Sequence, residues 1–147
     1  RGEVLALKQR DFVALAKARA LAQSRVQRIE FIESDLRQWN WPERAFDAVV
    51  SIFIQFAAPE ERQRLFARMR SALKPGGTLV LLGYAEAQLC LRTGGPQELE
   101  KLYSRELLTA EFADLAIEEL IEYREELSEG SAHRGPSALI CLVARRT

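Results

Sequence analysis

The run FDAVVSIFI, residues Phe46–Ile54, constrains the fold more than any other stretch because it is nearly all apolar. A strand that is apolar on both faces is typical of the centre of a parallel sheet that is covered by helices on either side. A second run of this kind, TLVLLGY (Thr78–Tyr84), follows after one helical segment. The order strand, helix, strand predicts an α/β unit.

The helical segment between these runs begins near Pro59, and acidic residues occupy its first turn, where the helix dipole favours them. Its apolar stripe consists of Leu65, Phe66, Met69 and Leu73. The sequence LKPGG ends the segment and leads into the second strand. A phosphate-binding loop needs its glycines after a strand and before a helix, so Pro75 and the two glycines are interpreted as a turn that ends the helix.

The remaining elements also alternate, so we expect a single domain over residues 1–147 built on an open α/β sheet. Residues Ala116–Leu127 are ambiguous, because their apolar positions suit a helix while some of them could share one strand face. The other expected elements are strands at Glu3–Leu7, Arg28–Glu33 and Ser137–Arg145, a helix from Asp11 to about Gln23, and a short helix from Ser104 to about Phe112.

The composition excludes several functional classes. The 147 residues contain 21 Lys and Arg and 21 Asp and Glu, so no net charge favours nucleic acid or an anionic membrane. No apolar run is long enough to span a bilayer, and no signal peptide opens the chain. Cys90 and Cys141 lie far apart and His133 is the single histidine, so we expect no metal site and a cytoplasmic location.

With these elements in order, the chain resembles the class I S-adenosylmethionine-dependent methyltransferases. The segment from Phe46 to Tyr84 carries the resemblance, since an acidic FD opens that family's fourth strand and LKPGG leads into its fifth. IEFIESDL, with Asp35, resembles the third strand and its adenine-contacting acid. LRTGGP and the terminal EGSAHRGPSALICLVAR look like a bacterial branch of the family.

The resemblance implies a Rossmann-like sheet, mostly parallel, with a C-terminal antiparallel hairpin, which favours a strand for Ala116–Leu127. It also implies S-adenosylmethionine as cofactor at the carboxyl ends of the first strands. Asp35, Leu36, Ser51 and Gln55 become the candidate cofactor-binding residues. Alternatively, Asp35 caps a turn, Ser51 is a small core residue and Gln55 satisfies the loop after its strand. Methyl transfer mainly requires alignment of a nucleophile with the methyl group, so we predict no dedicated catalytic residue.

Two departures from the family pattern bear on activity. The family's first strand and glycine-rich loop have no counterpart, because no glycine occurs between Gly2 and Gly76. Lys8 stands where the family's second strand ends in a ribose-binding acid, although Asp11 could substitute. We therefore expect an N-terminally truncated homologue that binds the cofactor weakly or not at all. The alternatives are an enzyme that retains binding, a non-catalytic oligomeric scaffold, and a fragment of a longer enzyme.

The missing strand also suggests how the chain assembles. In the family order it lies between the strands that correspond to Glu3–Leu7 and Phe46–Ile54. Its loss would leave a row of unpaired backbone groups on each of these strands, and exposed strand edges favour pairing. We therefore expect a homodimer formed through the sheet, with closure of the gap within one chain as the alternative. A small-molecule methyl acceptor is expected, but the sequence does not identify it.

Overall fold

The computed structural model describes residues 4–8, 12–25, 29–128 and 134–147. The chain divides into two compact units, Arg1–Asn40 and Trp41–Thr147. The expectation of one domain over residues 1–147 stays a prediction.

The first unit contains two parallel strands joined by a helix. Strand β1 (Val4–Lys8) pairs with β2 (Ile29–Glu33) in register from Val4 opposite Ile29 to Lys8 opposite Glu33. Helix α1 (Phe12–Ser24) connects the two strands. This strand–helix–strand order agrees with the sequence pattern.

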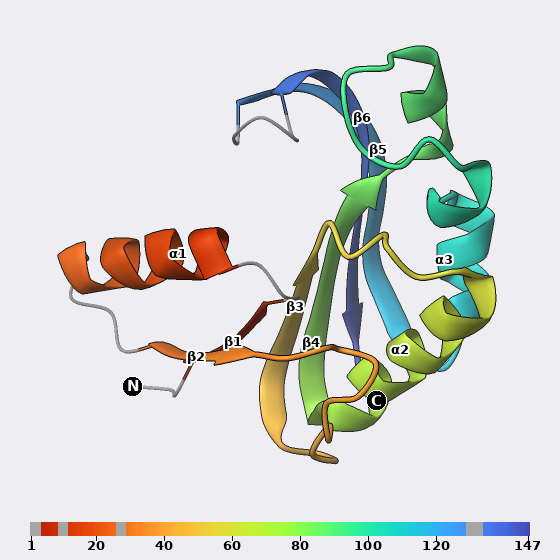
Figure 1. Ribbon diagram of the computed structural model, residues 1–147. Coiled ribbons are helices and arrows are strands. Elements are labelled where there is room, and N and C mark those ends of the chain that lie inside the picture. Colours follow the sequence, from red (N-terminus) through yellow and green to blue (C-terminus); the bar gives the residue numbers. More distant parts are fainter. Residues whose placement is uncertain (1–3, 9–11, 26–28, 129–133) are drawn as a thin grey trace. The chain divides into compact units, whose positions relative to one another are not determined.

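The second unit is built on a four-stranded sheet with the order β3-β4-β6-β5 (Figure 1). Strand β3 (Phe46–Ile52) is parallel to β4 (Leu73–Tyr84), and β6 (Arg134–Arg145) is antiparallel to both of its neighbours. The fourth strand, β5 (Ala116–Ser128), is the segment that the sequence left ambiguous. Pairing with β6 along its whole length overrides the helical spacing of its apolar residues, so the expected C-terminal antiparallel hairpin is confirmed.

Helices α2 (Pro59–Ala72) and α3 (Arg105–Glu111) lie on one face of this sheet (Figure 1). Leu65, Phe66 and Met69 of the predicted apolar stripe are buried on α2, whereas Leu73, which is also buried, begins β4. Phe66 packs against Phe112 with 4.9 Å between the ring centroids. Ser104 caps α3 by accepting a hydrogen bond from the Leu107 amide, as a serine before a helix predicts. Two short 3-10 helices, Glu86–Cys90 and Leu99–Lys101, lie between β4 and α3. No helix in the described ranges has the length and apolar character to cross a bilayer.

The structure differs from the turn predicted at LKPGG in the residue at which the strand begins. Helix α2 ends at Ala72, and the backbone is extended from Leu73 onward, so the strand begins before Pro75 rather than after the glycines. Gly76 has a φ of +76°, which glycine adopts without steric cost. A Cβ on Gly77 would lie 2.9 Å from the Lys74 carbonyl oxygen. The two glycines therefore allow the backbone to pass closely from the helix into the paired part of the strand. They do not form a phosphate-binding loop.

The prediction that Phe46–Ile54 forms a central strand covered on both faces is wrong for the described unit. Strand β3 is an outer strand of its sheet, and it ends at Ile52. Val50 is 60% exposed and Ile52 is 55% exposed. The physical reason is that the helices of this unit cover one face only, and the strand that the family resemblance places beside β3 has no counterpart in the described sheet.

Candidate functional site

The carboxyl ends of the parallel strands β3 and β4 lie at the same end of the sheet. Doubly wound folds bind their ligands at this end. The Phe53 amide donates to the Leu82 carbonyl at 2.9 Å, and the Phe53 and Tyr84 rings stack with 4.9 Å between their centroids. Phe53 has a φ of +50°, a left-handed conformation that costs a non-glycine residue about 1–3 kcal/mol. Such strain clusters at functional sites, so this strand end is a candidate functional site.

Ser51 is the second-to-last residue of β3, and its side chain is buried. It is 4% exposed, and its hydroxyl has no hydrogen-bond partner in the described part of the chain. A buried hydroxyl without a partner carries a desolvation cost of about 1–3 kcal/mol, so it is a group that a ligand could satisfy. Of the four predicted site residues, Ser51 has the side chain that best matches a cofactor-facing role.

Gln55 is buried, and its amide is committed to the protein's own backbone. The Nε2 atom donates to the carbonyl oxygens of Tyr84 at 2.9 Å and Lys101 at 3.0 Å, and Oε1 accepts from the Tyr84 amide at 2.6 Å. These bonds join the loop after β3, the end of β4 and the segment before α3. The geometry therefore favours the structural alternative for Gln55.

Tyr103 is a buried polar residue at this edge that the sequence reasoning missed. Its ring packs so closely on Gly83 that a Cβ there would lie 2.6 Å from a ring carbon. Burial raises the pKa of the Tyr103 phenol well above its usual range, and the positive charge of Arg62 opposes this only in part. Neither the Tyr103 hydroxyl nor Arg62 Nε has a hydrogen-bond partner among the described residues. No motif surrounds Tyr103, so the sequence held no signal for it.

Asp35 and Leu36 belong to the first unit, and both are buried. Arg37 holds the Asp35 carboxylate through a fork, with Nε at 2.9 Å from Oδ1 and NH2 at 2.7 Å from Oδ2. The Arg37 amide also donates to Oδ1 at 2.9 Å, and the amides of Gln38 and Trp39 both donate to the Asp35 carbonyl at 2.9 Å. Asp35 thus caps this turn, and its adenine contact stays a prediction.

Three further residues from the sequence reasoning lie at or beyond the limits of what is described. Lys8 ends β1, but its side chain is outside the described part of the structure. Asp11 and His133 lie outside the described residues altogether. Within the described ranges, no group of three or more His, Cys, Asp or Glu side chains could hold a metal ion.

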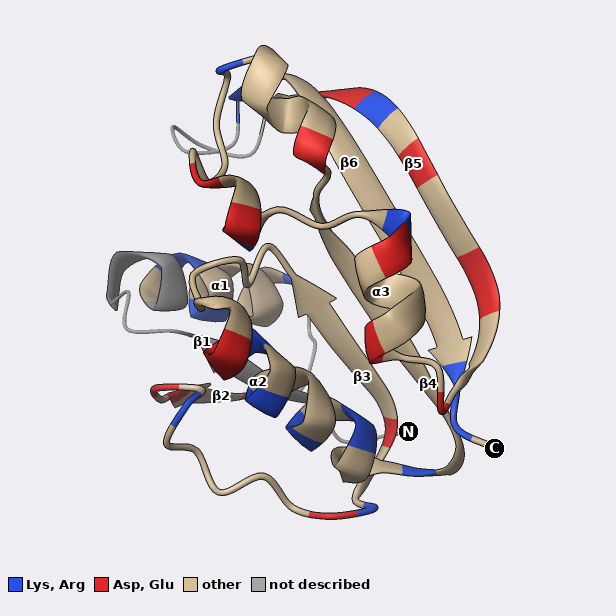
Figure 2. Cartoon of the chain, turned by 90° about the vertical axis from the view of Figure 1, so that its right-hand side faces the viewer, with Lys and Arg blue, Asp and Glu red and all other residues tan. Residues whose placement is uncertain are grey.

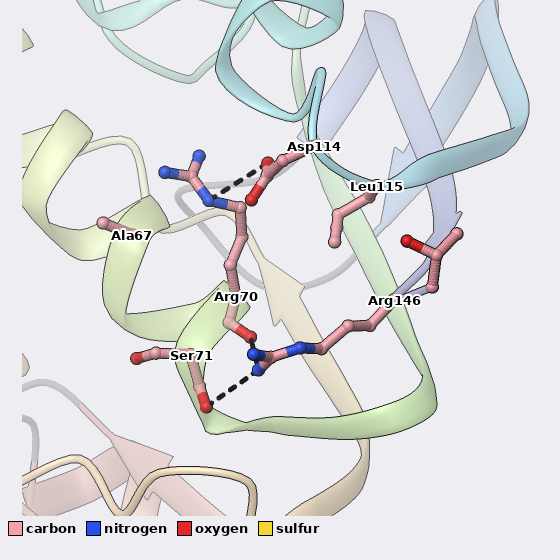
Figure 3. Close-up of a pocket in the computed structure, with 7 residues that line it drawn as sticks. Ala67, Arg70, Ser71, Asp114, Leu115 and Arg146 are labelled. Atoms are coloured by element: carbon pink, nitrogen blue, oxygen red, sulfur yellow. Dashed lines mark hydrogen bonds and ion pairs between the residues drawn. The ribbon is translucent and has the colours of Figure 1, made fainter.

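A pocket of about 420 Å³ lies where α2 ends and β4 begins, away from the carboxyl ends of the strands (Figure 3). Arg146 NH1 donates to three carbonyl oxygens there, those of Arg70 at 2.9 Å, Ser71 at 3.1 Å and Leu73 at 2.7 Å. Arg70 Nε lies 3.4 Å from the Asp114 carboxylate. Because a cation at a helix C-terminus satisfies its free carbonyls, these contacts are explained as a helix cap and an ion pair.

Comparisons with known proteins agree with the fold. The family model described as "Methyltransferase domain" matches residues 9–77. A carboxy-S-adenosyl-L-methionine synthase of Erwinia tasmaniensis is 45% identical over 53 residues, which cover 36% of this chain and 21% of that protein. The match therefore spans about a fifth of the relative's length.

Solved structures are similar over nearly the whole chain. A S-adenosylmethionine-dependent methyltransferase of Methanosarcina mazei has a TM-score of 0.73 and 17% identity, covering 98% of this chain and 82% of its own. The N-methyltransferase NodS of Bradyrhizobium japonicum, in complex with S-adenosyl-L-homocysteine, has a TM-score of 0.69 and 17% identity, covering 98% and 66%. The predicted Rossmann-like methyltransferase fold is confirmed.

In each unit, some of the polar groups that the family resemblance assigns to S-adenosylmethionine already have partners within the chain. Ser51 offers a buried hydroxyl without a partner, but the Asp35 carboxylate is held by Arg37 and the Gln55 amide by backbone groups. A cofactor that used either group would have to displace contacts that the chain already makes.

Proposed function

Because this chain has the methyltransferase fold and matches the methyltransferase domain over residues 9–77, we propose that it is a S-adenosylmethionine-dependent methyltransferase homologue. We further propose that these 147 residues by themselves bind the cofactor weakly or not at all. The observation that carries this second part is the engagement of Asp35 and Gln55 in internal hydrogen bonds. The acceptor is proposed to be a small molecule.

Two features of the sequence support weak binding. A backbone can approach a ligand closely at glycine, and no glycine occurs between Gly2 and Gly76. Lys8, at the end of β1, brings a positive charge to the position where the family resemblance places a ribose-binding acid. The cofactor's sulfonium is itself a cation, so this charge opposes its binding.

Unfolding in the presence of ligand tests the proposal. A ligand that binds only the folded state stabilises it by about 2.7 kcal/mol at a concentration one hundred times its Kd. At millimolar S-adenosylhomocysteine we expect a gain below about 0.4 kcal/mol, which corresponds to a Kd at or above the ligand concentration. A gain of about 2 kcal/mol or more would refute weak binding and would leave the chain as a cofactor-binding protein.

The alternative is a non-catalytic scaffold, and one observation favours it. Strand β3 exposes apolar side chains at an outer edge of the sheet, where a second copy could pair. We therefore propose that the chain forms a homodimer through its sheet. A stable monomer of 16.7 kDa across concentrations in light scattering would reject it. The cytoplasmic location and the bacterial origin stay predictions from sequence.

A further inference from the structure

Arginine residues recur along helix α2, and one of them is buried. Figure 2 shows these basic segments, which follow the acidic first turn of the helix. Arg62 is 8% exposed and belongs to the buried face of α2, whereas Arg64 is exposed. A buried guanidinium is costly unless a counter-charge and hydrogen bonds compensate for the water that it loses. The partners of Arg62 therefore need to be accounted for.

Arg62 has no counter-charge in the part of the chain that the structure describes. Its guanidinium donates to the carbonyl oxygen of Glu100, which is a neutral acceptor. No carboxylate among the described residues forms an ion pair with it, and its Nε atom has no hydrogen-bond partner there. The guanidinium thus keeps a positive charge and a donor that a ligand could satisfy.

The Tyr103 hydroxyl is a second buried group without a partner at this place. The Tyr103 ring contacts Phe66 of α2, with 5.8 Å between the ring centroids, and it lies against Gly83 near the carboxyl end of β4. Burial raises the pKa of the Tyr103 phenol and the charge of Arg62 lowers it in part, so the two groups are close in space. A guanidinium and a hydroxyl therefore lie together between α2 and the end of the sheet at which doubly wound folds bind ligands.

We propose that Arg62 and Tyr103 bind a carboxylate group of the small-molecule acceptor. This inference deepens the proposed function, and it rests on that function only in calling the ligand the acceptor. Both side chains can donate, and a carboxylate accepts from both. Its single negative charge equals the positive charge of Arg62, whereas a phosphate monoester carries about −1.5 to −2 at pH 7 and would leave excess charge buried.

The site is closed in this structure, so a ligand enters when its cover moves. The 3-10 helix Leu99–Lys101 lies against Arg62, because the Glu100 carbonyl accepts from the guanidinium. None of the three residues of this helix is buried, and Leu99 is 55% exposed. A short segment with little buried surface opens more readily than the core of a fold. Its displacement allows a carboxylate to replace the Glu100 carbonyl as the partner of Arg62.

Urea unfolding of the full chain with acetate as the probe tests this site. Sodium acetate replaces sodium chloride at constant ionic strength. At about 0.2 M acetate we expect the folding equilibrium constant to rise at least about threefold, as it does for a ligand that binds only the folded state with a Kd of about 0.1 M. Arg62→Met should abolish this rise, because it removes the charge and the donor. Arg64→Met is the matched control, since it removes an exposed arginine from the same helix, and it should keep the rise.

Two further measurements decide the matter if Arg62→Met does not fold. Tyr103→Phe keeps the ring and removes the hydroxyl, so it should reduce the rise, and acetate should shift the NMR resonance of the Arg62 Nε–H group in the parent. An acetate effect that is absent from the parent, or equal in the parent and Arg62→Met, would overturn the site. A larger rise with inorganic phosphate than with acetate would overturn the choice of a carboxylate. No measurement includes S-adenosylmethionine, so a failure here removes the acceptor's carboxylate and leaves the proposed cofactor behaviour to its own test.

Discussion

Replacing Gln55 by leucine tests whether this residue supports the fold or faces a ligand. The substitution keeps a similar size but removes both ends of the amide. The Tyr84 amide and the Lys101 carbonyl would lose the bonds that Gln55 makes to them, whereas the Tyr84 carbonyl keeps its bond from the Tyr103 amide at 3.0 Å. One buried and one partly buried group are thus left without this partner, at a cost of about 1–3 kcal/mol each.

The added apolar surface of leucine offsets about 1 kcal/mol, so we expect Gln55→Leu to lower the free energy of unfolding by about 1–5 kcal/mol. Urea unfolding measures this as a lower midpoint with an unchanged m-value. Gln97→Leu is the matched control, because Gln97 is exposed and its amide makes one long hydrogen bond, 3.3 Å to Gly95. The control should stay within about 0.5 kcal/mol of the parent. A Gln55→Leu variant as stable as the control would show that the amide does not bridge these segments.

Three further outcomes follow from single side chains. Tyr103→Phe removes a buried hydroxyl without a partner in the described structure, so stability at pH 7 should not fall. Because the pKa of Tyr103 is raised in the folded state, the stability that its neutral form contributes is present below the unfolded pKa of about 10 and is lost as the pH rises above it. Urea unfolding of the variant should therefore show a smaller loss of stability at alkaline pH than that of the parent. Arg146→Ala should cost about 1–3 kcal/mol in urea unfolding through the uncapped end of α2, whereas Arg145→Ala, which loses an exposed pair with Glu118, should cost less than 1 kcal/mol. Lys8→Asp should strengthen S-adenosylmethionine binding in calorimetry if a cofactor site exists at β1; no gain would place Lys8 elsewhere.

Much of the fold could be predicted because apolar runs and helix signals are local. Helix α2 and strand β4 follow from the periodicity of their own residues. Residues Ala116–Leu127 could not be assigned from periodicity, because their extended form depends on pairing with β6, far along the chain. The exposure of β3 was missed for the same reason: an apolar run indicates that a strand can be buried, and its neighbours decide whether it is.

The candidate site was less predictable. Position in the chain placed Ser51 and Gln55 near the end of β3, but the direction of the Gln55 amide depends on backbone groups at Tyr84 and Lys101. Arg37, two residues beyond Asp35, folds back onto its carboxylate, and a spacing of two carries no general signal for this. Tyr103 comes to the site through its packing on Gly83, a contact between distant segments.

Calorimetric titration of the 147-residue chain with S-adenosylmethionine tests the central claim most directly. We expect a Kd in the millimolar range or no measurable heat, because the side chains of Asp35 and Gln55 are committed to internal contacts. A Ser51→Ala variant should then titrate in the same way as the parent. A micromolar Kd that Ser51→Ala weakens would contradict the account and would establish that the end of β3 is a working cofactor site.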